Sequence, residues 1–335
     1  MEAVGCIIDA GQHGKTEILA QSVPASPGQG RMRMNYSTAG KRRVSAAAIC
    51  LLALLLAGPA LTPACAQQAA PPYGNNAAVG RYAQVNGVKL YYEIYGQGEP
   101  LLLIHGNGGK ISAFKKQIDY FRKKYQVIAV DSREQGKSSD TTEEITYEKM
   151  AADFNALLGQ LKTGPVYVLG WSDGAINALL LGIHYPDKVK KIAAMAANLN
   201  PDEQAVYPDV WAWSHGMLDG MPAAARETPE GKRAIKVTSM MFSHPHIPFE
   251  DLHKISAPAL VLAGDHDLIR DEHTLEIFHH IPQSQLCIFP DATHLIPWQR
   301  PNDFNTAVDR FFREPFRKKD RIKDIEKDLL DLLAH

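Results

Sequence analysis

The pentapeptide Gly170-Trp171-Ser172-Asp173-Gly174 follows an apolar run at 166–169 and precedes a helical pattern at 175–181. This is Gly-x-Ser-x-Gly in the strand, turn, helix context that gives the pattern its meaning. A glycine two positions before and after the serine lets the backbone turn sharply, so the hydroxyl stands exposed at the carboxyl end of the strand. Ser172 is therefore the candidate nucleophile.

Short apolar runs recur on both sides of this turn and alternate with segments of helical spacing. The runs occupy 101–104, 127–130, 166–169, 191–195, 259–263 and 285–289. Because they are apolar on both faces, they suit parallel strands covered by helices on each side. Upstream, Asn86-Gly87 joins two strand patterns and predicts a tight antiparallel hairpin. The sequence thus predicts an α/β fold with a mostly parallel sheet flanked by helices on both faces.

The first part of the chain has the layout of an export signal. Basic residues at 41–43 precede an apolar run at 45–61, and small residues follow it. The run is shorter than the about 20 apolar residues of a membrane span. We expect 1–66 to be a leader with its true start at Met32 or Met34, cleaved on export to the periplasm or the medium without stable membrane insertion. Retention of the leader as an anchor is the alternative.

The remainder divides into three segments, and the second of them carries an insertion. Small and polar residues at 67–79 predict a flexible tether before a domain at 80–315. The interval 200–248 is far longer than a crossover needs and predicts an inserted helical cap. The final segment, 316–335, places apolar residues on one helical face. This amphipathic helix packs on the domain, forms a homodimer with a second copy, or stays solvated.

Composition and charge narrow the class of protein. Without residues 1–66 the chain carries 30 Lys and Arg against 34 Asp and Glu, so nothing indicates nucleic-acid binding. Cys287 is then the single remaining cysteine, and we expect a buried, unreactive thiol. The histidines and aspartate of 244–253 match no zinc-binding spacing. We therefore expect no metal and no cofactor.

A serine nucleophile needs a base, and the base needs an acid to hold its tautomer. Two downstream strands end in polar loops, one carrying Asp265 and Asp267, the other carrying His294. Carboxyl ends of parallel strands meet at one sheet edge, so His294 is predicted as the base of Ser172. Asp267 is favoured over Asp265 as the acid, because the turn needs a residue or two before a side chain points back across the edge.

The strand at 101–104 runs into the glycine-rich turn His105-Gly106-Asn107-Gly108-Gly109. Acyl transfer needs donors aimed at the developing oxyanion. We predict the backbone amides of Asn107 and of Asp173, the residue after the nucleophile, as these donors. His105 is expected to support the loop by hydrogen bonding rather than to transfer protons.

In this order and spacing, the motifs over about 82–312 resemble the α/β-hydrolase family. The resemblance implies a Ser, acid, His order and places the acid of Gly-x-x-Asp at Asp267. The segment 131–138 resembles the family's Asp-x-Arg-Gly-x-Gly-x-Ser loop, with Glu134 where glycine is usual. Within the family, the elbow and Ala196-Ala197-Asn198 are similar to the biphenyl-hydrolase-like enzymes, which cleave amino-acid esters.

That resemblance gives Asp173 a second expected role. In the biphenyl-hydrolase-like enzymes, the aspartate after the nucleophile is associated with binding the substrate's amino group, which implies substrate binding by Asp173 and the adjacent Trp171. A carboxylate beside an oxyanion hole opposes the transition-state charge unless a cation neutralises it. The alternative is that the dipole of the following helix favours a negative side chain there, whatever the substrate.

We therefore expect hydrolysis of a small ester, or a related acyl bond, through an acyl-enzyme on Ser172. Carbon–carbon bond hydrolases, lactonases and perhydrolases use the same triad, and a non-catalytic binding protein of this fold is a further alternative. Epoxide hydrolases and haloalkane dehalogenases are disfavoured because they use aspartate at the position of Ser172. The large apolar cap residues are expected to line an acyl or alcohol pocket; they are Trp211, Trp213, Met217, Met240, Met241 and Phe242.

Overall fold

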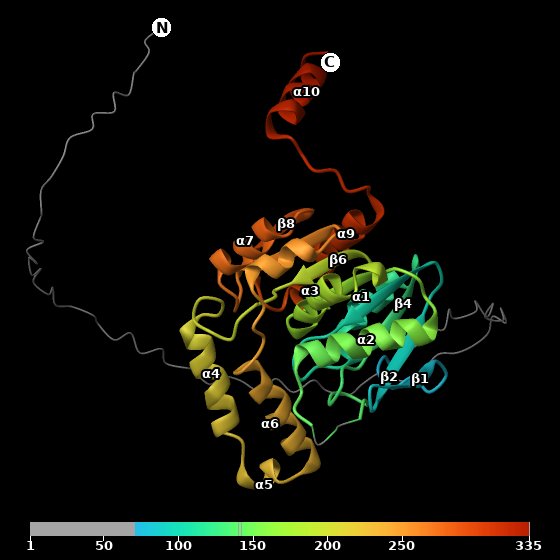
Figure 1. Ribbon diagram of the computed structural model, residues 1–335, viewed down its shortest axis with the longest axis vertical. Helices are drawn as coiled ribbons and strands as arrows, with labels where there is room; N and C mark the ends of the chain where they lie inside the picture. Colours follow the sequence, from blue (N-terminus) through green and yellow to red (C-terminus); the bar gives the residue numbers. More distant parts are fainter. Residues whose placement is uncertain (1–70, 140, 142, 335) are drawn as a thin grey trace, which may run out of the picture. The chain divides into compact units, whose positions relative to one another are not determined.

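A mixed sheet of eight strands organises the described part of the chain, which comprises residues 71–139, 141 and 143–334 of the computed structural model (Figure 1). The strands are β1 (Gly80–Val85), β2 (Val88–Tyr95), β3 (Glu99–Ile104), β4 (Tyr125–Val130), β5 (Val166–Trp171), β6 (Val189–Met195), β7 (Ala259–His266) and β8 (Ser284–Thr293). Their order is β1-β2-β4-β3-β5-β6-β7-β8, parallel from β4 onward. Each predicted parallel strand lies within an observed one, so the predicted fold class is confirmed.

The antiparallel part of the sheet is the predicted hairpin. β1 pairs with β2 in register from Val85 opposite Val88, and β2 continues antiparallel to β4. Asn86 and Gly87 have φ angles of 41° and 80°, the left-handed conformation that a two-residue hairpin turn requires.

Helices cover both faces of the sheet, and the alternation of strand residues separates two cores. Leu102 and Ile104 pack in the core beneath α2 (Tyr147–Leu161), α3 (Asp173–His184) and α7 (Asp271–His280). Leu101 and Leu103 point the other way, into the core beneath α1 (Lys115–Phe121) and α9 (Pro301–Arg313). The same strands therefore supply both layers, which explains why their sequence is apolar throughout.

The long interval between β6 and β7 contains three α-helices and a 3-10 helix at Phe249–Lys254; the α-helices are labelled in Figure 1. They are α4 (Pro208–Asp219), α5 (Ala223–Arg226) and α6 (Pro229–Met241). Thr228 caps α6 by accepting a hydrogen bond from the Gly231 amide at 2.9 Å. These helices occupy the interval predicted as the cap, and the name cap is kept for residues 200–248.

The segment before the first strand departs from expectation. The leader, its signal peptide and the start at Met32 or Met34 lie outside the described residues. In 71–79, the Tyr73 side chain is buried, and the amides of Gly74 and Asn76 donate to the Glu93 carboxylate at 2.7 and 2.8 Å. The prediction of a flexible tether is therefore wrong for 71–79, because a buried acid on β2 anchors this stretch.

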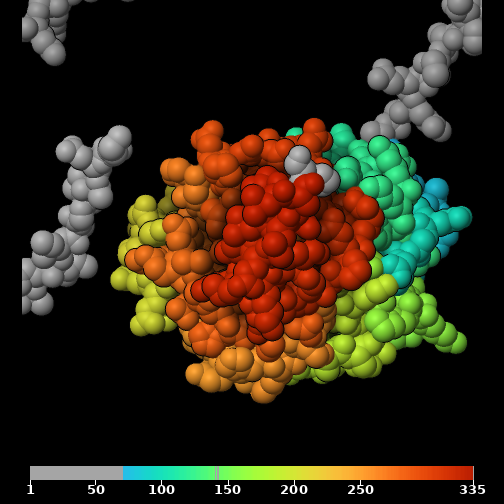
Figure 2. Space-filling view, turned by 90° about the horizontal axis from the view of Figure 1, so that it is seen from above, coloured from blue at the N-terminus to red at the C-terminus, as the bar shows by residue number. Residues whose placement is uncertain are grey.

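The C-terminal helix α10 (Arg321–Leu333) is amphipathic, as predicted, and its apolar side chains are exposed. In the face shown in Figure 2, no other described segment lies over the C-terminal residues, drawn in red. A homodimer through this helix stays a prediction. None of the helices within 71–334 has the length and apolar character needed to cross a bilayer.

Candidate active site

Ser172 occupies the sharp turn between β5 and α3. Its φ of 56° and ψ of −121° are a strained combination for a residue with a side chain. Both flanking glycines are required by close approach: a Cβ at Gly170 would lie 2.0 Å from the Gly174 carbonyl oxygen, and one at Gly174 would lie 1.8 Å from that of Ile104. The structure thus holds the serine in the conformation of a nucleophile elbow.

His294 and Asp267 meet at the carboxyl ends of β7 and β8. The Nδ1 atom of His294 lies 2.7 Å from Oδ1 of Asp267, whose side chain is fully buried. Asp267 also accepts from the backbone amides of Leu268 at 2.7 Å and Gly264 at 3.2 Å. Since the carboxylate accepts a hydrogen bond from Nδ1–H and so fixes this tautomer, Nε2 carries no proton and is free to act as a base. His294 and Ser172 line the same cavity.

The competing acid, Asp265, lies elsewhere. Its exposed carboxylate accepts from the amides of Asp291 at 2.9 Å and Ala292 at 3.0 Å, and from the His266 ring at 2.8 Å. These bonds, the one from Ala292 above all, hold the pKa of Asp265 well below its usual range. Asp265 therefore ties the two loops together, while Asp267 contacts the histidine.

The glycine-rich turn after β3 lies against the elbow. Asn107 and Asp173 both line the cavity, and no hydrogen bond joins the backbone amide of either to another described residue. His105 is buried; its Nε2 accepts from the Ser132 amide at 3.0 Å, so its Nδ1 donates to the Gly106 carbonyl at 2.8 Å. Burial lowers the pKa of His105 to about 4, which keeps the ring neutral and consistent with support of the loop.

Asp173 is buried beside the nucleophile with neutral partners. Its two oxygens accept from the Asn107 side-chain amide at 2.8 Å and the Tyr147 hydroxyl at 2.9 Å. Burial raises the pKa of Asp173 to about 6, although both hydrogen bonds oppose that shift. Within the described residues no lysine or arginine forms an ion pair with it. Tyr147 belongs to the first turn of α2, and no local motif marks it as a site residue.

A cavity of about 720 Å³ joins these groups, and its surface is mostly apolar. All four tryptophans of the chain contribute to it: Trp171, Trp211, Trp213 and Trp298. Met217 and Met241 of the cap line it as predicted. Met240 and Phe242 do not: Met240 is buried in the core beneath the cap, and Phe242 stacks on the His215 ring at 3.8 Å.

Trp171, predicted to contact substrate, lines the cavity and also holds the histidine loop. Its indole N–H donates to the backbone carbonyl of His294 at 2.9 Å. The residue before the nucleophile is thus joined directly to the residue that carries the imidazole.

Comparisons with known proteins agree with this arrangement. A family model described as alpha/beta hydrolase fold matches residues 99–246. The human serine hydrolase BPHL is 28% identical over 246 residues, covering 68% of this chain and 84% of the relative. 3-Oxoadipate enol-lactonase 2 of Acinetobacter baylyi is 26% identical, with 66% and 92% covered. A thermophilic esterase structure from Thermogutta terrifontis (malate bound) superposes with a TM-score of 0.59 at 25% identity, with 70% and 98% covered.

The chain has the α/β-hydrolase fold. BPHL is named as a serine hydrolase and another relative as an enol-lactonase, and the protein is a hydrolase. The similarity to BPHL agrees with the resemblance in the elbow sequence.

Proposed function

We propose that the protein is a serine hydrolase that cleaves small esters whose acyl part carries a positive charge. Ser172 is the nucleophile, His294 the base and Asp267 the acid. The observation that carries the proposal is the set of groups around one apolar cavity: the strained serine, the 2.7 Å histidine–aspartate pair, and the buried Asp173 carboxylate without a cationic partner among the described residues.

The geometry supports a two-step acyl transfer. His294 Nε2 takes the proton of the Ser172 hydroxyl as its oxygen attacks the ester carbonyl, and the buried Asp267 stabilises the resulting imidazolium. The amides of Asn107 and Asp173 receive the developing oxyanion. His294 then gives the proton to the departing alkoxide. In the second step the same imidazole activates a water molecule, which attacks the acyl-enzyme and releases the carboxylic acid product from Ser172.

The position of Asp173 supports the charge requirement. A carboxylate at the start of α3 gains from the helix dipole, but dipole stabilisation alone would not explain its burial at a substrate cavity. Burial raises the pKa of Asp173 to about 6, so keeping its carboxylate ionised near pH 7 costs free energy of desolvation. A substrate ammonium in the cavity would supply the missing counter-charge and offset the repulsion between Asp173 and the oxyanion.

Lactone opening is the second candidate, because it is the same acyl chemistry and because 3-oxoadipate enol-lactonase 2 is 26% identical to this chain. An apolar cavity of about 720 Å³ accommodates either a linear ester or a lactone ring. The two candidates differ in substrate, while the catalytic residues are the same.

Two measurements test the proposal. Fluorophosphonate labelling is expected for the wild-type protein and absent in Ser172→Ala; an unlabelled wild type would instead favour a binding protein of the same fold. A panel of p-nitrophenyl esters of graded length, aminoacyl esters and lactones then identifies the substrate class. We expect the highest kcat/KM for aminoacyl esters, and a preference for uncharged esters or lactones would remove the charge requirement.

A further inference from the structure

The loop 131–138 departs from the family pattern at Glu134, where glycine is usual. Glu134 has a φ of 66°, in the left-handed region that disfavours a residue with a side chain. The residue is 1% exposed, so its carboxylate is also taken out of water. Both features are unfavourable on their own, and a compensating contact is expected.

That contact comes from the cap. Lys236 of α6 donates from Nζ to Oε1 of Glu134 at 2.6 Å and to the Thr141 carbonyl at 2.5 Å. The Thr141 amide donates to the same Glu134 oxygen at 2.8 Å. The lysine side chain is 29% exposed and the glutamate 1%, so solvent screens this pair less than an exposed one. We call the Glu134–Lys236 ion pair the clasp.

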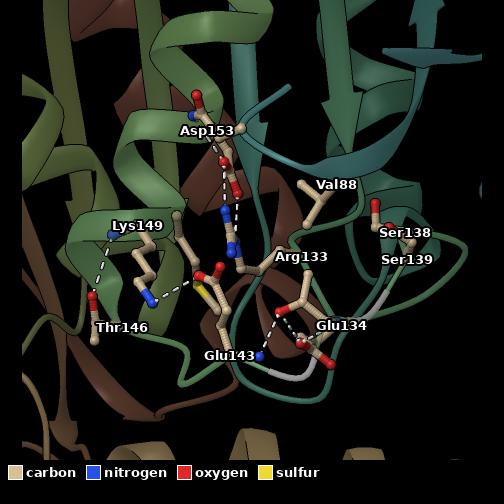
Figure 3. Close-up of polar contacts among 12 residues, drawn as sticks. Val88, Arg133, Glu134, Ser138, Ser139, Glu143, Thr146, Lys149 and Asp153 are labelled. Carbon is tan, nitrogen blue, oxygen red and sulfur yellow. Dashed lines mark hydrogen bonds and ion pairs between the residues drawn. The ribbon is translucent and has the colours of Figure 1, made fainter. Parts of the chain in front are cut away.

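The core half of the clasp is fixed in place. The neighbouring Arg133 forms two hydrogen bonds with Asp153 of α2, at 2.7 and 2.8 Å, and both side chains are buried (Figure 3). A paired, bidentate guanidinium beside Glu134 leaves the loop little freedom to move. The clasp therefore holds α6 against a rigid partner.

The next residue of α6 reaches the active site. The Val237 carbonyl accepts a hydrogen bond from the Asn107 side-chain amide at 3.0 Å, and the same amide donates to Asp173 at 2.8 Å. Thr238 and Met241, further along α6, line the cavity. Helix α6 thus connects the clasp to the glycine-rich turn 105–109, through Asn107 to the buried Asp173, and to the cavity wall.

We propose that Glu134 and Lys236 are positioning residues of the hydrolase site. Their ion pair fixes α6, and α6 fixes the Asn107 side chain through the Val237 carbonyl, so the clasp sets how well the cavity fits the ester. This inference rests on the proposed function, because ester turnover is its main measure.

The test compares Glu134→Gly, Lys236→Met and the double variant. Glu134→Gly removes the carboxylate and also relieves the left-handed backbone, so loss of folding is not expected. Lys236→Arg keeps the charge and serves as the conservative variant. Lys232→Met is the matched control, since Lys232 is an exposed lysine on the same helix that pairs with Glu227.

We expect each single variant to lower kcat/KM for an aminoacyl ester about tenfold, mainly through a higher KM, and the double variant to lose no more than either. Lys236→Arg should stay within about twofold of wild type, as should Lys232→Met. Unchanged kinetics in Glu134→Gly, or losses that multiply in the double variant, would contradict the positioning role of the Glu134–Lys236 ion pair.

A second readout separates this inference from the proposed function. If the wild-type protein neither labels with fluorophosphonate nor turns over any ester, the proposed function fails. Amide hydrogen exchange in 237–241 then tests by itself whether the Glu134–Lys236 ion pair holds α6 in place. Faster exchange there in both single variants, with an unchanged rate in β5, supports the clasp. Exchange equal to that of the wild type contradicts it.

Discussion

Two buried aspartates of the candidate active site differ in how their charge is satisfied. Asp267, at the end of β7, has a histidine partner and accepts several backbone amides. Asp173, at the start of α3, has one neutral side-chain donor on each oxygen, and its pKa is raised by burial. Asp267 has its partner within the protein, whereas no lysine or arginine of the described residues pairs with Asp173, and His294 has the smallest of the effects on the pKa of Asp173.

Under the proposed function, Asp267 serves the reaction and Asp173 serves recognition of the substrate. An acid that orients a base needs its partner at all times, so the protein supplies that partner. Under the same proposal, Asp173 selects a charged substrate and leaves room for its cation, and burial without that cation raises the pKa of Asp173. Four experiments test this contrast between Asp267 and Asp173.

Replacing Asp267 is expected to lower the activity most. Asp267→Asn should lower kcat by about 10,000-fold, because the imidazole loses the carboxylate that fixes its tautomer. The matched control is Asp265→Asn, which alters an exposed aspartate that does not contact His294. Steady-state kinetics on one ester measure both, and equal losses in the two variants would contradict the assignment of Asp267.

Replacing Asp173 should affect selection more than chemistry. We expect Asp173→Asn to lower kcat/KM about 100-fold for an aminoacyl ester, since a desolvated charge pair is lost. For the uncharged acyl analogue, kcat/KM should change little or rise, because the repulsion of the oxyanion is removed. If the preference between the two esters is the same in both proteins, Asp173 does not bind the cation.

The preference for a cation should depend on pH with a definite sign. The pKa of Asp173 is about 6, so the side chain is ionised above this pH and neutral below it. An ester bearing a guanidinium group keeps its charge throughout, and its kcat/KM relative to the neutral analogue should rise about tenfold from pH 5 to pH 7. Taking the ratio cancels titrations that affect both substrates alike. A flat ratio would show that Asp173 is not the selecting group.

Tyr147→Phe should give the smallest effect. The phenol stabilises ionised Asp173, so its removal raises the pKa of Asp173 further and moves the midpoint of the selectivity profile to higher pH. A shift of about one pH unit would reduce the preference at pH 7 about twofold. An unshifted midpoint, in a variant that melts at a similar temperature, would show that this hydrogen bond contributes nothing to the charge of Asp173.

The parts that the sequence predicts are those encoded locally. The six parallel strands follow from short apolar runs, and Ser172 follows from glycines two positions away. Asp267 and His294 follow from the rule that parallel strands end at one edge, although they are 95 and 122 positions beyond the serine. An approximate order of the strands in the sheet is enough to predict that Asp267 and His294 lie near Ser172, and the fold class constrains that order.

The parts that escape prediction depend on contacts between distant segments. Tyr147 and Lys236 look like ordinary helical residues until the fold brings them to Asp173 and Glu134. The stretch 71–79 has the composition of a tether, but composition does not reveal that Glu93 is buried and accepts its amides. Glu134 does carry a local signal, a departure from glycine, which marks an unusual backbone without indicating its partner.

The placement of the four tryptophans gives the protein a built-in optical signal. Because every indole of the chain lines the cavity, nearly all of its tryptophan emission comes from the walls of the site. Ligands entering the cavity displace water from several indoles at once and change the emission wavelength and yield. Binding to the inactive Ser172→Ala protein can therefore be followed by intrinsic fluorescence, without a chromogenic ester and for ligands that are never turned over.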